Sequence, residues 1–501
     1  MPKIGYKRLA ITILTLIALG GIMFIQVAAQ SSTSPWTPPI NVSQSGAASQ
    51  PVIAAAPNGS LYVMWWDTAE GELFARADLT STNWTQPASV PPVYGLRKID
   101  DVTKRVTLAP PSSVRLAATT NGEIHALWTD SDLHLFDAQA TSASWSNGTA
   151  LAEAASTFIA ASDVNGGLHL AYVRPLNAVG APPGIYYRAG TGGKWGGASL
   201  VDESAYFRTA KPGETHLGVA GDKQDHVIVV WDDPQSGQNM YARSSDGGST
   251  WSNPQIISGT QGSLATQARI ATAPNGEFLL QWQETGASGC GSLQRRSNDG
   301  GQTWSAPERI LSSLDQCPAD WTFMPGSDGR LWLIGAASGV LSADSRTAIL
   351  TAWDGQAWSE PLAVNMSFYD PASRNTINLS CLDIALNGQS VGLVGCANNN
   401  DVWAARNAVE LDQFGAALKT NWTAIETISN GNSSAAPDGL PAIAADSQGH
   451  FYATWSQAEP AGGTSLFAAA WSGSHWSRPI QLLRPTGSAT DAASLSELDQ
   501  P

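Results

Sequence analysis

One short pattern recurs along most of this chain and limits what it can fold into: a tight turn followed by an alternating strand. In a clear copy, Asn58-Gly59 precedes apolar residues at every second position from Leu61 to Trp65. Asn-Gly favours a hairpin because both residues tolerate positive φ, and period-two apolar residues predict a strand buried on one face. Asp225 stands at the glycine position of one copy. At intervals of about 50–60 residues, eight such strands begin at Leu61, Ile124, Leu168, Val227, Phe278, Leu331, Val391 and Phe451.

A second signal alternates with these hairpins: a Trp, usually followed by Ser or Thr and often by Pro two positions later. Eight hairpins and nine such Trp residues predict eight units of four short strands, A to D in chain order, with the Trp opening strand D. Repeated four-stranded units predict an all-β fold, a single β-propeller of about eight blades. Seven blades with one aberrant unit is the alternative. The surplus strand at Trp36 would pair into the last blade and close the ring. The nine residues are Trp36, Trp84, Trp145, Trp195, Trp251, Trp304, Trp358, Trp422 and Trp476.

The N-terminal segment has the pattern of a secretory signal. Lys3, Lys7 and Arg8 precede an uncharged apolar run over 9–27, and small residues follow up to Ala29. We expect cleavage after Ala29; the alternative is an uncleaved membrane anchor, because the run is nearly long enough to span a bilayer. The predicted organisation is a signal peptide or anchor over 1–29, a propeller over 30–484 and a disordered tail over 485–501. Both alternatives place the propeller outside the cytoplasm, with a membrane tether as a possible partner.

Charge and cysteine usage agree with this placement. The net charge is -15, and an acidic chain without a basic stripe disfavours a nucleic-acid partner. Four cysteines suit an oxidising compartment. Cys381 and Cys396 flank the Asn387-Gly388 turn and would lie opposite each other in a hairpin. Cys290 and Cys317 would then pair by elimination; the alternative is four buried free thiols.

Two segments share one motif. Residues Ser244–Trp251 read SSDGGSTW and Ser297–Trp304 read SNDGGQTW. Both resemble the Asp boxes of the sialidase-like (BNR-repeat) propeller superfamily, which implies a propeller and a structural role for the motif. The Asp side chain caps amides of its own loop, the glycines supply positive φ, and the Trp inserts between blades. The residues in these roles are Ser244, Asp246, Gly248, Trp251, Ser297, Asp299, Gly301 and Trp304.

The sialidase substrate anchors do not carry over to this chain. The resemblance implies an Arg just before the first inner strand, but residues 48–51 have Ser49 at that place. It also implies an Arg beyond the next strand, where residues 66–68 have none. No Tyr/Glu nucleophile pair can be assigned. We therefore expect no sialidase activity by the usual mechanism.

Blade geometry separates the loops into two faces. The A–B and C–D turns, including the Asp boxes, lie on one face, and the B–C and D–A loops lie on the other, where the resemblance places ligands. Acids at the ends of four B strands could ring a central funnel and bind a cation or a polyol; the alternative is solvated acids inherited from the repeat. With one loop acid, the catalytic candidates are Asp67, Asp130, Asp233, Glu284 and Asp370.

Three longer D–A loops combine aromatic residues with arginines. A ring stacks on a sugar and a guanidinium binds carboxylates bidentately, so such loops on a rigid scaffold suit glycan recognition; ordinary loop anchoring is the alternative. The histidines show no metal-ligand spacing, so we predict no metal and no cofactor. The ligand-binding candidates are Arg97, Tyr206, Arg208, Tyr369 and Arg374.

These features predict a secreted or surface-anchored propeller of the sialidase superfamily that binds a glycan or an extracellular protein without catalysis. The alternative is an exo-sialidase-like glycoside hydrolase with a rebuilt active site. A close carboxyl pair beside arginines would favour the enzyme, because most glycosidases use two carboxyl groups about 5–9.5 Å apart. Acids spread around an open ring would favour binding.

Overall fold

The computed structural model describes most of the chain between Trp36 and Arg406, and the backbone of four strands between Asp438 and Leu483. The longest gaps in the first range are 91–96, 100–105, 312–318 and 339–345. The chain forms two compact units, Ser34–Lys419 and a second that combines Met1–Thr33 with Thr420–Pro501. The predicted signal or anchor over 1–29 and the predicted tail over 485–501 lie outside the described residues.

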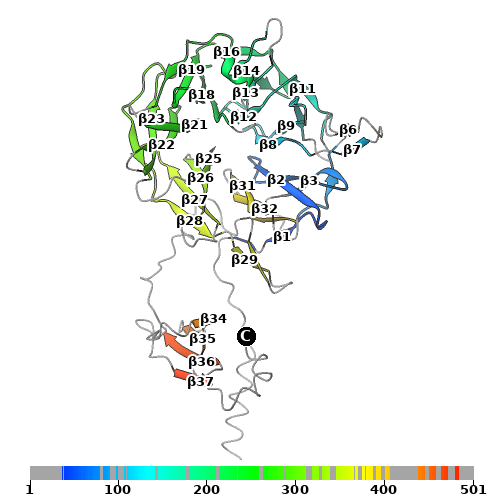
Figure 1. Ribbon diagram of the computed structural model, residues 1–501, viewed down its shortest axis with the longest axis vertical. Coiled ribbons are helices and arrows are strands. Elements are labelled where there is room, and N and C mark those ends of the chain that lie inside the picture. The colour runs from blue at the N-terminus through cyan, green and yellow to red at the C-terminus, as the bar shows by residue number, and fades with distance from the viewer. Residues whose placement is uncertain are drawn as a thin grey trace, which may run out of the picture. The chain divides into compact units, whose positions relative to one another are not determined.

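The first unit is a β-propeller of seven antiparallel blades, arranged in a ring in Figure 1. The innermost strands contact one another in the order β2, β8, β12, β17, β21, β25, β31 and back to β2. Blade 1 contains β2 (Ala48–Ala55), β3 (Leu61–Asp67), β4 (Gly71–Ala77) and β5 (Ala88–Ser89), and blade 2 contains β8 (Ser113–Ala118), β9 (Ile124–Thr129), β10 (Leu135–Gln139) and β11 (Thr149–Ala152). Blade 3 contains β12 (Thr157–Ser162), β13 (Leu168–Arg174), β14 (Gly184–Thr191), β15 (Lys194–Trp195) and β16 (Ser199–Glu203), and blade 4 contains β17 (Leu217–Gly221), β18 (Val227–Asp233), β19 (Gln238–Ser244) and β20 (Gln255–Ile256). Blade 5 contains β21 (Leu264–Thr272), β22 (Phe278–Gly286), β23 (Gly289–Ser297) and β24 (Glu308–Ile310), and blade 6 contains β25 (Ala319–Pro325), β26 (Leu331–Ser338), β27 (Arg346–Trp353) and β28 (Leu362–Asn365).

Blade 7 is completed by the start of the chain. It contains β31 (Ser380–Leu386), β32 (Val391–Cys396) and β33 (Val402–Arg406), and β1 (Ile40–Asn41) pairs with β33 as its outer strand. The predicted closing strand near Trp36 therefore exists, and of the two blade numbers left open by the sequence the ring has seven. The eighth repeat forms a separate four-stranded sheet in the second unit, with β34 (Asp438–Ala445), β35 (Phe451–Ala458), β36 (Thr464–Trp471) and β37 (Ile480–Leu483).

The hydrophobic core of the ring is divided among the seams between blades. Met64 and Trp66 of blade 1 pack in one cluster with Ile124 and Trp128 of blade 2. In three seams the recurring Trp lies four residues before the start of strand D, and does not open that strand as predicted. It packs edge-on against an aromatic ring of the preceding blade's strand C, with ring centroids 5.2–5.9 Å apart. Those pairs are Trp145 with Phe74, Trp251 with Tyr187, and Trp304 with Tyr241. The recurring Trp thus joins neighbouring blades.

The A–B turns have a different geometry from the predicted one. Gly59 has φ of 84°, but Asn58 is not among the residues with positive φ. The Gly59 amide donates to the Ala56 carbonyl, and the Ala56 amide donates to Ser60. This is a type I turn followed by a left-handed residue, in which only the glycine needs positive φ. Asp225, with φ of 61°, occupies the equivalent place in blade 4.

Two cysteines can be placed in the ring. Cys290 in β23 and Cys396 in β32 are each disulfide-bonded. The side chains of Cys317 and Cys381 lie outside the described residues. The backbone register sets Cys396 opposite Ser380, one residue from Cys381. The pairing of Cys381 with Cys396, and of Cys290 with Cys317, stays a prediction.

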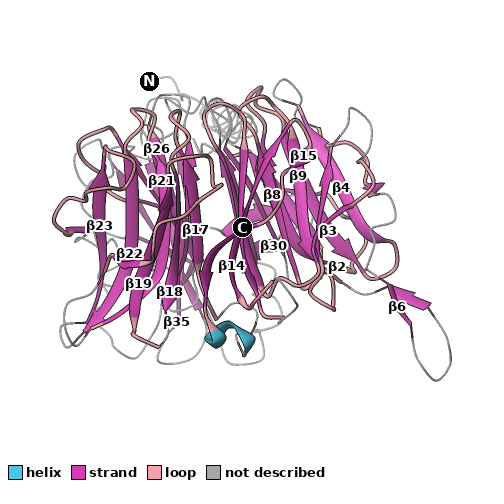
Figure 2. Ribbon diagram, turned by 90° about the horizontal axis from the view of Figure 1, so that it is seen from above, coloured by secondary structure: helices cyan, strands magenta, loops and turns pink. Residues whose placement is uncertain are grey.

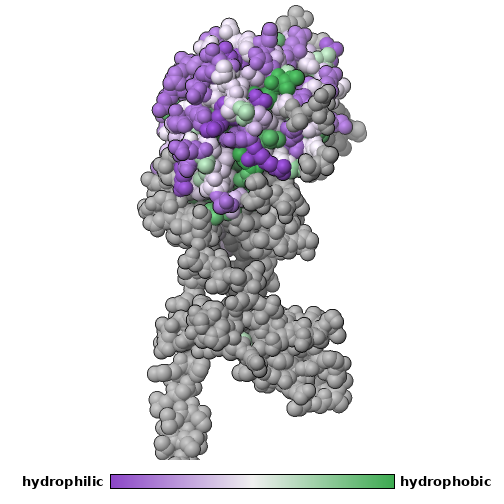
Figure 3. All heavy atoms as spheres, turned by 90° about the vertical axis from the view of Figure 1, so that its left-hand side faces the viewer, coloured by the Kyte–Doolittle hydropathy of each residue, from purple (hydrophilic) through white to green (hydrophobic). Residues whose placement is uncertain are grey.

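The outer surface of the ring is mainly hydrophilic on the side that Figure 3 shows, with small hydrophobic patches. The exposed large apolar side chains with the highest values, Ile256 at 60% and Leu264 at 51%, lie on different strands. This distribution agrees with a core that is buried in the seams. Over the described residues, no helix is both long and apolar enough to cross a membrane.

One carboxylate adds three hydrogen bonds to the closing segment, so we expect Asp401→Ala to destabilise the propeller. Asp401 accepts hydrogen bonds from the Asn41 amide group (2.9 Å), the Ser43 hydroxyl (3.1 Å) and the Gly46 backbone amide (2.6 Å). Loss of their buried partner costs on the order of 1–3 kcal/mol, measurable as a shift in the urea midpoint. Asp132→Ala, in an exposed turn of blade 2, is the control. Equal stability of both variants would contradict this role.

The seam between blades 1 and 2 contains a buried acid, which predicts pH-dependent stability. Glu72 of β4 is buried, neither carboxyl oxygen has a hydrogen-bond partner, and it borders a cavity of about 10 Å³ with Met64 and Trp128. Burial raises its pKa from 4.5 to about 8. The folded state therefore keeps a proton that the unfolded state releases, so stability falls as pH rises from about 4.5 to about 8, by on the order of several kcal/mol.

Glu72→Gln removes this ionisation while keeping the size of the side chain. We expect the variant to lose much less stability than the wild type between pH 5 and pH 8.5 in denaturant titrations. Glu70→Gln, an exposed neighbour in the adjacent turn, should behave like the wild type. A Glu72→Gln curve parallel to that of the wild type would show that the Glu72 carboxyl does not govern the pH dependence.

Candidate functional site

The two faces of the ring carry different structures. One face holds the B–C turns and the D–A connections, and we call it the loop face; the other holds the A–B turns and Asp boxes, and we call it the Asp-box face. The helix η2 (Ala205–Arg208) and the hairpin of β6 (Arg97–Ile99) and β7 (Val106–Leu108) both lie at the loop face, along the lower edge of the disc in Figure 2. A third D–A connection forms the hairpin of β29 (Ser367–Asp370) and β30 (Asn375–Asn378).

Three of the predicted acids fold back onto their own B–C turns. Asp67 accepts hydrogen bonds from the amides of Ala69 (2.8 Å) and Glu70 (3.1 Å). Burial alone would raise its pKa, but these bonds and one from the Ser45 hydroxyl outweigh burial and lower it. Asp67 is buried and holds its own turn in shape, so it is not the solvated acid that was the alternative expectation.

The other two turn acids have the same arrangement. Asp130 accepts from the Asp132 and His134 amides, both at 2.9 Å, and its second oxygen lies 2.9 Å from His134 Nδ1. Asp233 accepts from the Gln235 amide (3.1 Å) and the Ser236 hydroxyl (2.6 Å).

The two remaining acids differ from these turn caps. Glu284 accepts hydrogen bonds from the Ser263 hydroxyl and the Trp282 indole. Asp370 pairs with Asn375 through the backbone, and its side chain lies outside the described residues. Among the described residues, the one group of three potential metal ligands is Asp130, Asp132 and His134, all within a single turn. Within the part of the chain that the structure describes, Asp67, Asp130, Asp233 and Glu284 do not share one group of potential metal ligands.

One acid at this face with four hydrogen-bond partners was missed by the sequence pattern. Asp232, one position before the predicted Asp233, is buried. It accepts from the amides of Gln267 (2.8 Å) and Ala268 (2.9 Å) in blade 5, and lies 2.7 Å from both His216 Nδ1 and Asn239 Nδ2. Asp232 therefore binds the backbone of a bulge in the next blade. No signal within the repeat singled out Asp232, because the same place in other repeats holds Trp66, Thr129 or Gln283.

The predicted ligand-binding residues come from three different D–A connections. In η2, Phe207 is buried as an anchor, Tyr206 packs edge-on against it at 5.7 Å, and Arg208 is exposed at the end of the helix. Burial raises the pKa of Tyr206, and the nearby charges of Glu214 and Asp233 add to this. For the other candidates the backbone alone is described, with Arg97 opposite Leu108 and Tyr369 opposite Thr376. Arg374 lies outside the described residues.

On the Asp-box face, Asp246 and Asp299 hold their loops in the same way. Asp246 accepts from the Thr250 hydroxyl (2.7 Å), the Thr250 amide (2.9 Å) and the Ser244 hydroxyl (2.7 Å), and these bonds lower its pKa to about 2. For Asp299, burial opposes the shift, but bonds from Thr303 and Ser297 outweigh it and lower the pKa to about 2. These carboxylates are occupied by loop contacts.

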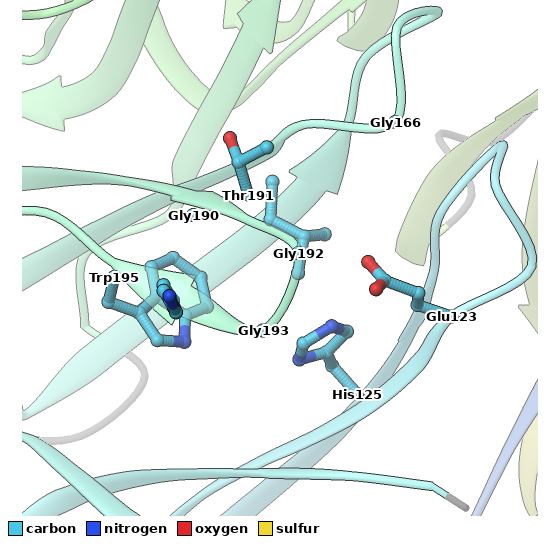
Figure 4. Close-up of a pocket in the computed structure, with 10 residues that line it drawn as sticks. Glu123, His125, Gly166, Gly190, Thr191, Gly192, Gly193 and Trp195 are labelled. Atoms are coloured by element: carbon cyan, nitrogen blue, oxygen red, sulfur yellow. The ribbon is translucent and has the colours of Figure 1, made fainter.

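The same face has a depression between blades 2 and 3, shown in Figure 4, where His125 and Glu123 face the turn that carries Gly193. His125 Nδ1 lies 3.0 Å from Asp137 Oδ1, and the Trp195 indole donates to Asp137 Oδ2 at 2.8 Å. The depression has no room for a water molecule. This buried network joins two blades and is not a binding pocket.

We expect Asp246→Ala and Asp299→Ala to lower the Tm, on the order of 2 °C each, without changing ligand binding. The reason is that each removes a carboxylate that holds several loop donors on the Asp-box face. Differential scanning fluorimetry measures the first effect and glycan retention the second. Ser249→Ala, in the loop of Asp246, removes a single hydroxyl donor and is the control. A variant that keeps its Tm but loses glycan binding would contradict the placement of the ligand on the loop face.

Comparisons with known proteins give structural similarity alone. No protein-family model matches the sequence, and no curated protein sequence matches it. An ulvan lyase of polysaccharide lyase family PL25, solved with -[GlcA(1-4)Rha3S]-, is similar over 76% of this chain and 100% of its own, with 10% identity and a TM-score of 0.47. A protein of unknown function from Dyadobacter fermentans covers 75% of this chain and 99% of its own (14% identity, TM-score 0.39). The Aleuria aurantia lectin with Fucα1-6GlcNAc covers 65% and 97% (12% identity, TM-score 0.36).

Proposed function

We propose that this chain is a non-catalytic, glycan-binding propeller that acts outside the cytoplasm, with the ligand on the loop face. The Asp boxes support its placement near the sialidase-like superfamily, because both loops have the hydrogen bonds that the motif implies. The apolar N-terminal segment and the disulfide-bonded Cys290 and Cys396 support a location outside the cytoplasm.

The observation that carries the proposal is the contrast between the two residue sets on the loop face. The turn acids Asp67, Asp130 and Asp233 are engaged by donors of their own turns. A hydrolase needs carboxyl groups that face the substrate at a defined separation, whereas these three carboxylates accept hydrogen bonds from their own turns. The exposed Arg208 and its neighbour Tyr206, in contrast, lie on a connection anchored by Phe207. That arrangement suits binding by stacking and bidentate hydrogen bonds.

The test is a glycan array probed with the full chain, followed by titration of the best glycan. Tyr206→Ala and Arg208→Ala should each weaken binding by about tenfold, since one stacking or charged contact contributes about 1–3 kcal/mol. Lys223→Ala removes an exposed charge on the Asp-box face and should leave affinity unchanged. Equal losses in all three variants would contradict a ligand on the loop face.

A second assay on the same protein tests the enzyme alternative. On a fluorogenic sialoside we expect no turnover, because Ser49 stands where the resemblance requires an arginine. Turnover that is abolished by Arg97→Ala, Arg208→Ala or Arg374→Ala would establish the exo-sialidase-like hydrolase with a rebuilt site instead.

A further inference from the structure

The innermost strands of the seven blades surround the central channel of the ring (Figure 1). Residues of all seven blades line a cavity there, which we call the central cavity. Its volume is about 290 Å³, near the lower end of the range of small-molecule sites. Its wall is mainly apolar and includes Leu116, Val219, Ile270, Phe323 and Leu386, from five different blades.

Among the described residues that line the central cavity, only Asp163 is charged. Each inner strand runs from the loop face to its A–B turn on the Asp-box face, and Asp163 follows β12 in that turn. In other blades the residue at this place is recognised by its amide, which donates to the carbonyl four positions later. Blades 1, 2 and 5 have the uncharged Ala56, Thr119 and Ala273 there. The lining therefore has one fixed charge, an anion at the Asp-box end.

The contacts of Asp163 keep it ionised. Its Oδ1 accepts hydrogen bonds from the amides of Asn165 (2.7 Å) and Gly167 (2.8 Å), and its Oδ2 lies 3.2 Å from His169 Nε2. Burial opposes ionisation of Asp163, but these contacts outweigh burial and lower its pKa. The carboxylate is therefore negative at neutral pH.

His169 does not have to carry a compensating charge. Its Nδ1 lies 2.7 Å from the Tyr187 hydroxyl, and burial raises the pKa of Tyr187, so that hydroxyl keeps its proton. A neutral imidazole that donates through Nε2 to Asp163 and accepts through Nδ1 from Tyr187 satisfies both contacts. The negative charge at the end of the central cavity is then left for a ligand to neutralise.

The surroundings of the cavity favour a cation at this end. Arg115 of β8 precedes Leu116 on the loop-face side and does not line the central cavity. A ligand cation would thus meet Asp163 at the Asp-box end and Arg115 only beyond the other end. The net charge of -15 on the chain also attracts cations over anions.

We propose that the central cavity binds a small amphipathic amine, with its ammonium group at Asp163 and its hydrocarbon part against the apolar wall. An ammonium group forms charge-assisted hydrogen bonds with a carboxylate, and each buried methylene tightens binding by about fourfold. A carboxylate ligand would meet the like charge of Asp163, and an uncharged ligand of equal length would gain the apolar contacts alone. This site is separate from the loops proposed to bind glycan.

The experiment is calorimetric titration of the full chain at neutral pH with hexylamine, 1-hexanol and hexanoate, which share one hydrocarbon chain. We expect hexylamine to bind about tenfold more tightly than 1-hexanol, because only the amine gains a charged hydrogen bond. Hexanoate should bind more weakly than both. Ethylamine keeps the ammonium group but lacks most of the methylenes, so it should bind at least about tenfold more weakly than hexylamine.

Asp163→Asn removes the charge but keeps a side-chain oxygen for the turn amides. It should weaken hexylamine binding about tenfold, to the level of 1-hexanol, and leave 1-hexanol binding unchanged. Asp222→Asn is the matched control. Asp222 accepts from the amides of Gln224 (2.8 Å) and His226 (2.9 Å) in the equivalent turn of blade 4, but it does not line the central cavity.

Thr322→Phe tests the hydrocarbon part of the site. Thr322 lines the central cavity and its side chain is exposed, so a phenyl ring can occupy the cavity without disturbing a seam. We expect this variant to lose binding of both hexylamine and 1-hexanol. Its retention on the glycan array should be unchanged, so failure of the central site and failure of the glycan proposal are distinguishable.

Near-UV circular dichroism verifies that each variant is folded. If Asp163→Asn unfolds, the ligand series on the wild type and Thr322→Phe decide the question. Three results would each overturn the proposal: no hexylamine binding, equal affinity for hexylamine and hexanoate, or hexylamine binding that folded Asp163→Asn or Thr322→Phe leaves unchanged.

Discussion

The propeller depends on the pairing of its first strand with its last blade. Each seam buries apolar residues of two neighbouring blades, so an open ring would leave two apolar faces exposed to water. Because β1 pairs with β33, the start of the chain completes blade 7 and the ring has no open end. Asp401 also accepts hydrogen bonds from Asn41, Ser43 and Gly46, which are about 355–360 positions away in sequence. The geometry of both faces follows from this closure, because every blade is held between two others.

Much of this architecture could be predicted from the sequence because it is local. The strand-B alternation, the left-handed residue of the A–B turn and the recurring Trp are set within one repeat, and the B strands begin where the alternation predicts them. The number of blades could not be predicted in this way, since it depends on which repeat the closing strand meets. The eighth repeat carries the same local pattern, yet it belongs to the other unit.

The candidate sites were harder to predict because they depend on contacts between blades. Asp233 fits the repeat pattern but only caps its turn, whereas Asp232 binds a bulge in the next blade that no local signal reveals. Glu72 looks like an ordinary strand residue until its seam is assembled around it.

Closure by β1 also makes the ring circular in a topological sense. The Thr37 amide donates to the Arg406 carbonyl at 2.8 Å, so the chain enters and leaves the ring at one place. No blade is therefore structurally first. Joining these two points and cutting an exposed A–B turn would give a circular permutant with the same seams and the same channel. The order of blades along the gene is then a matter of chain connectivity, while their order around the axis is what the packing preserves.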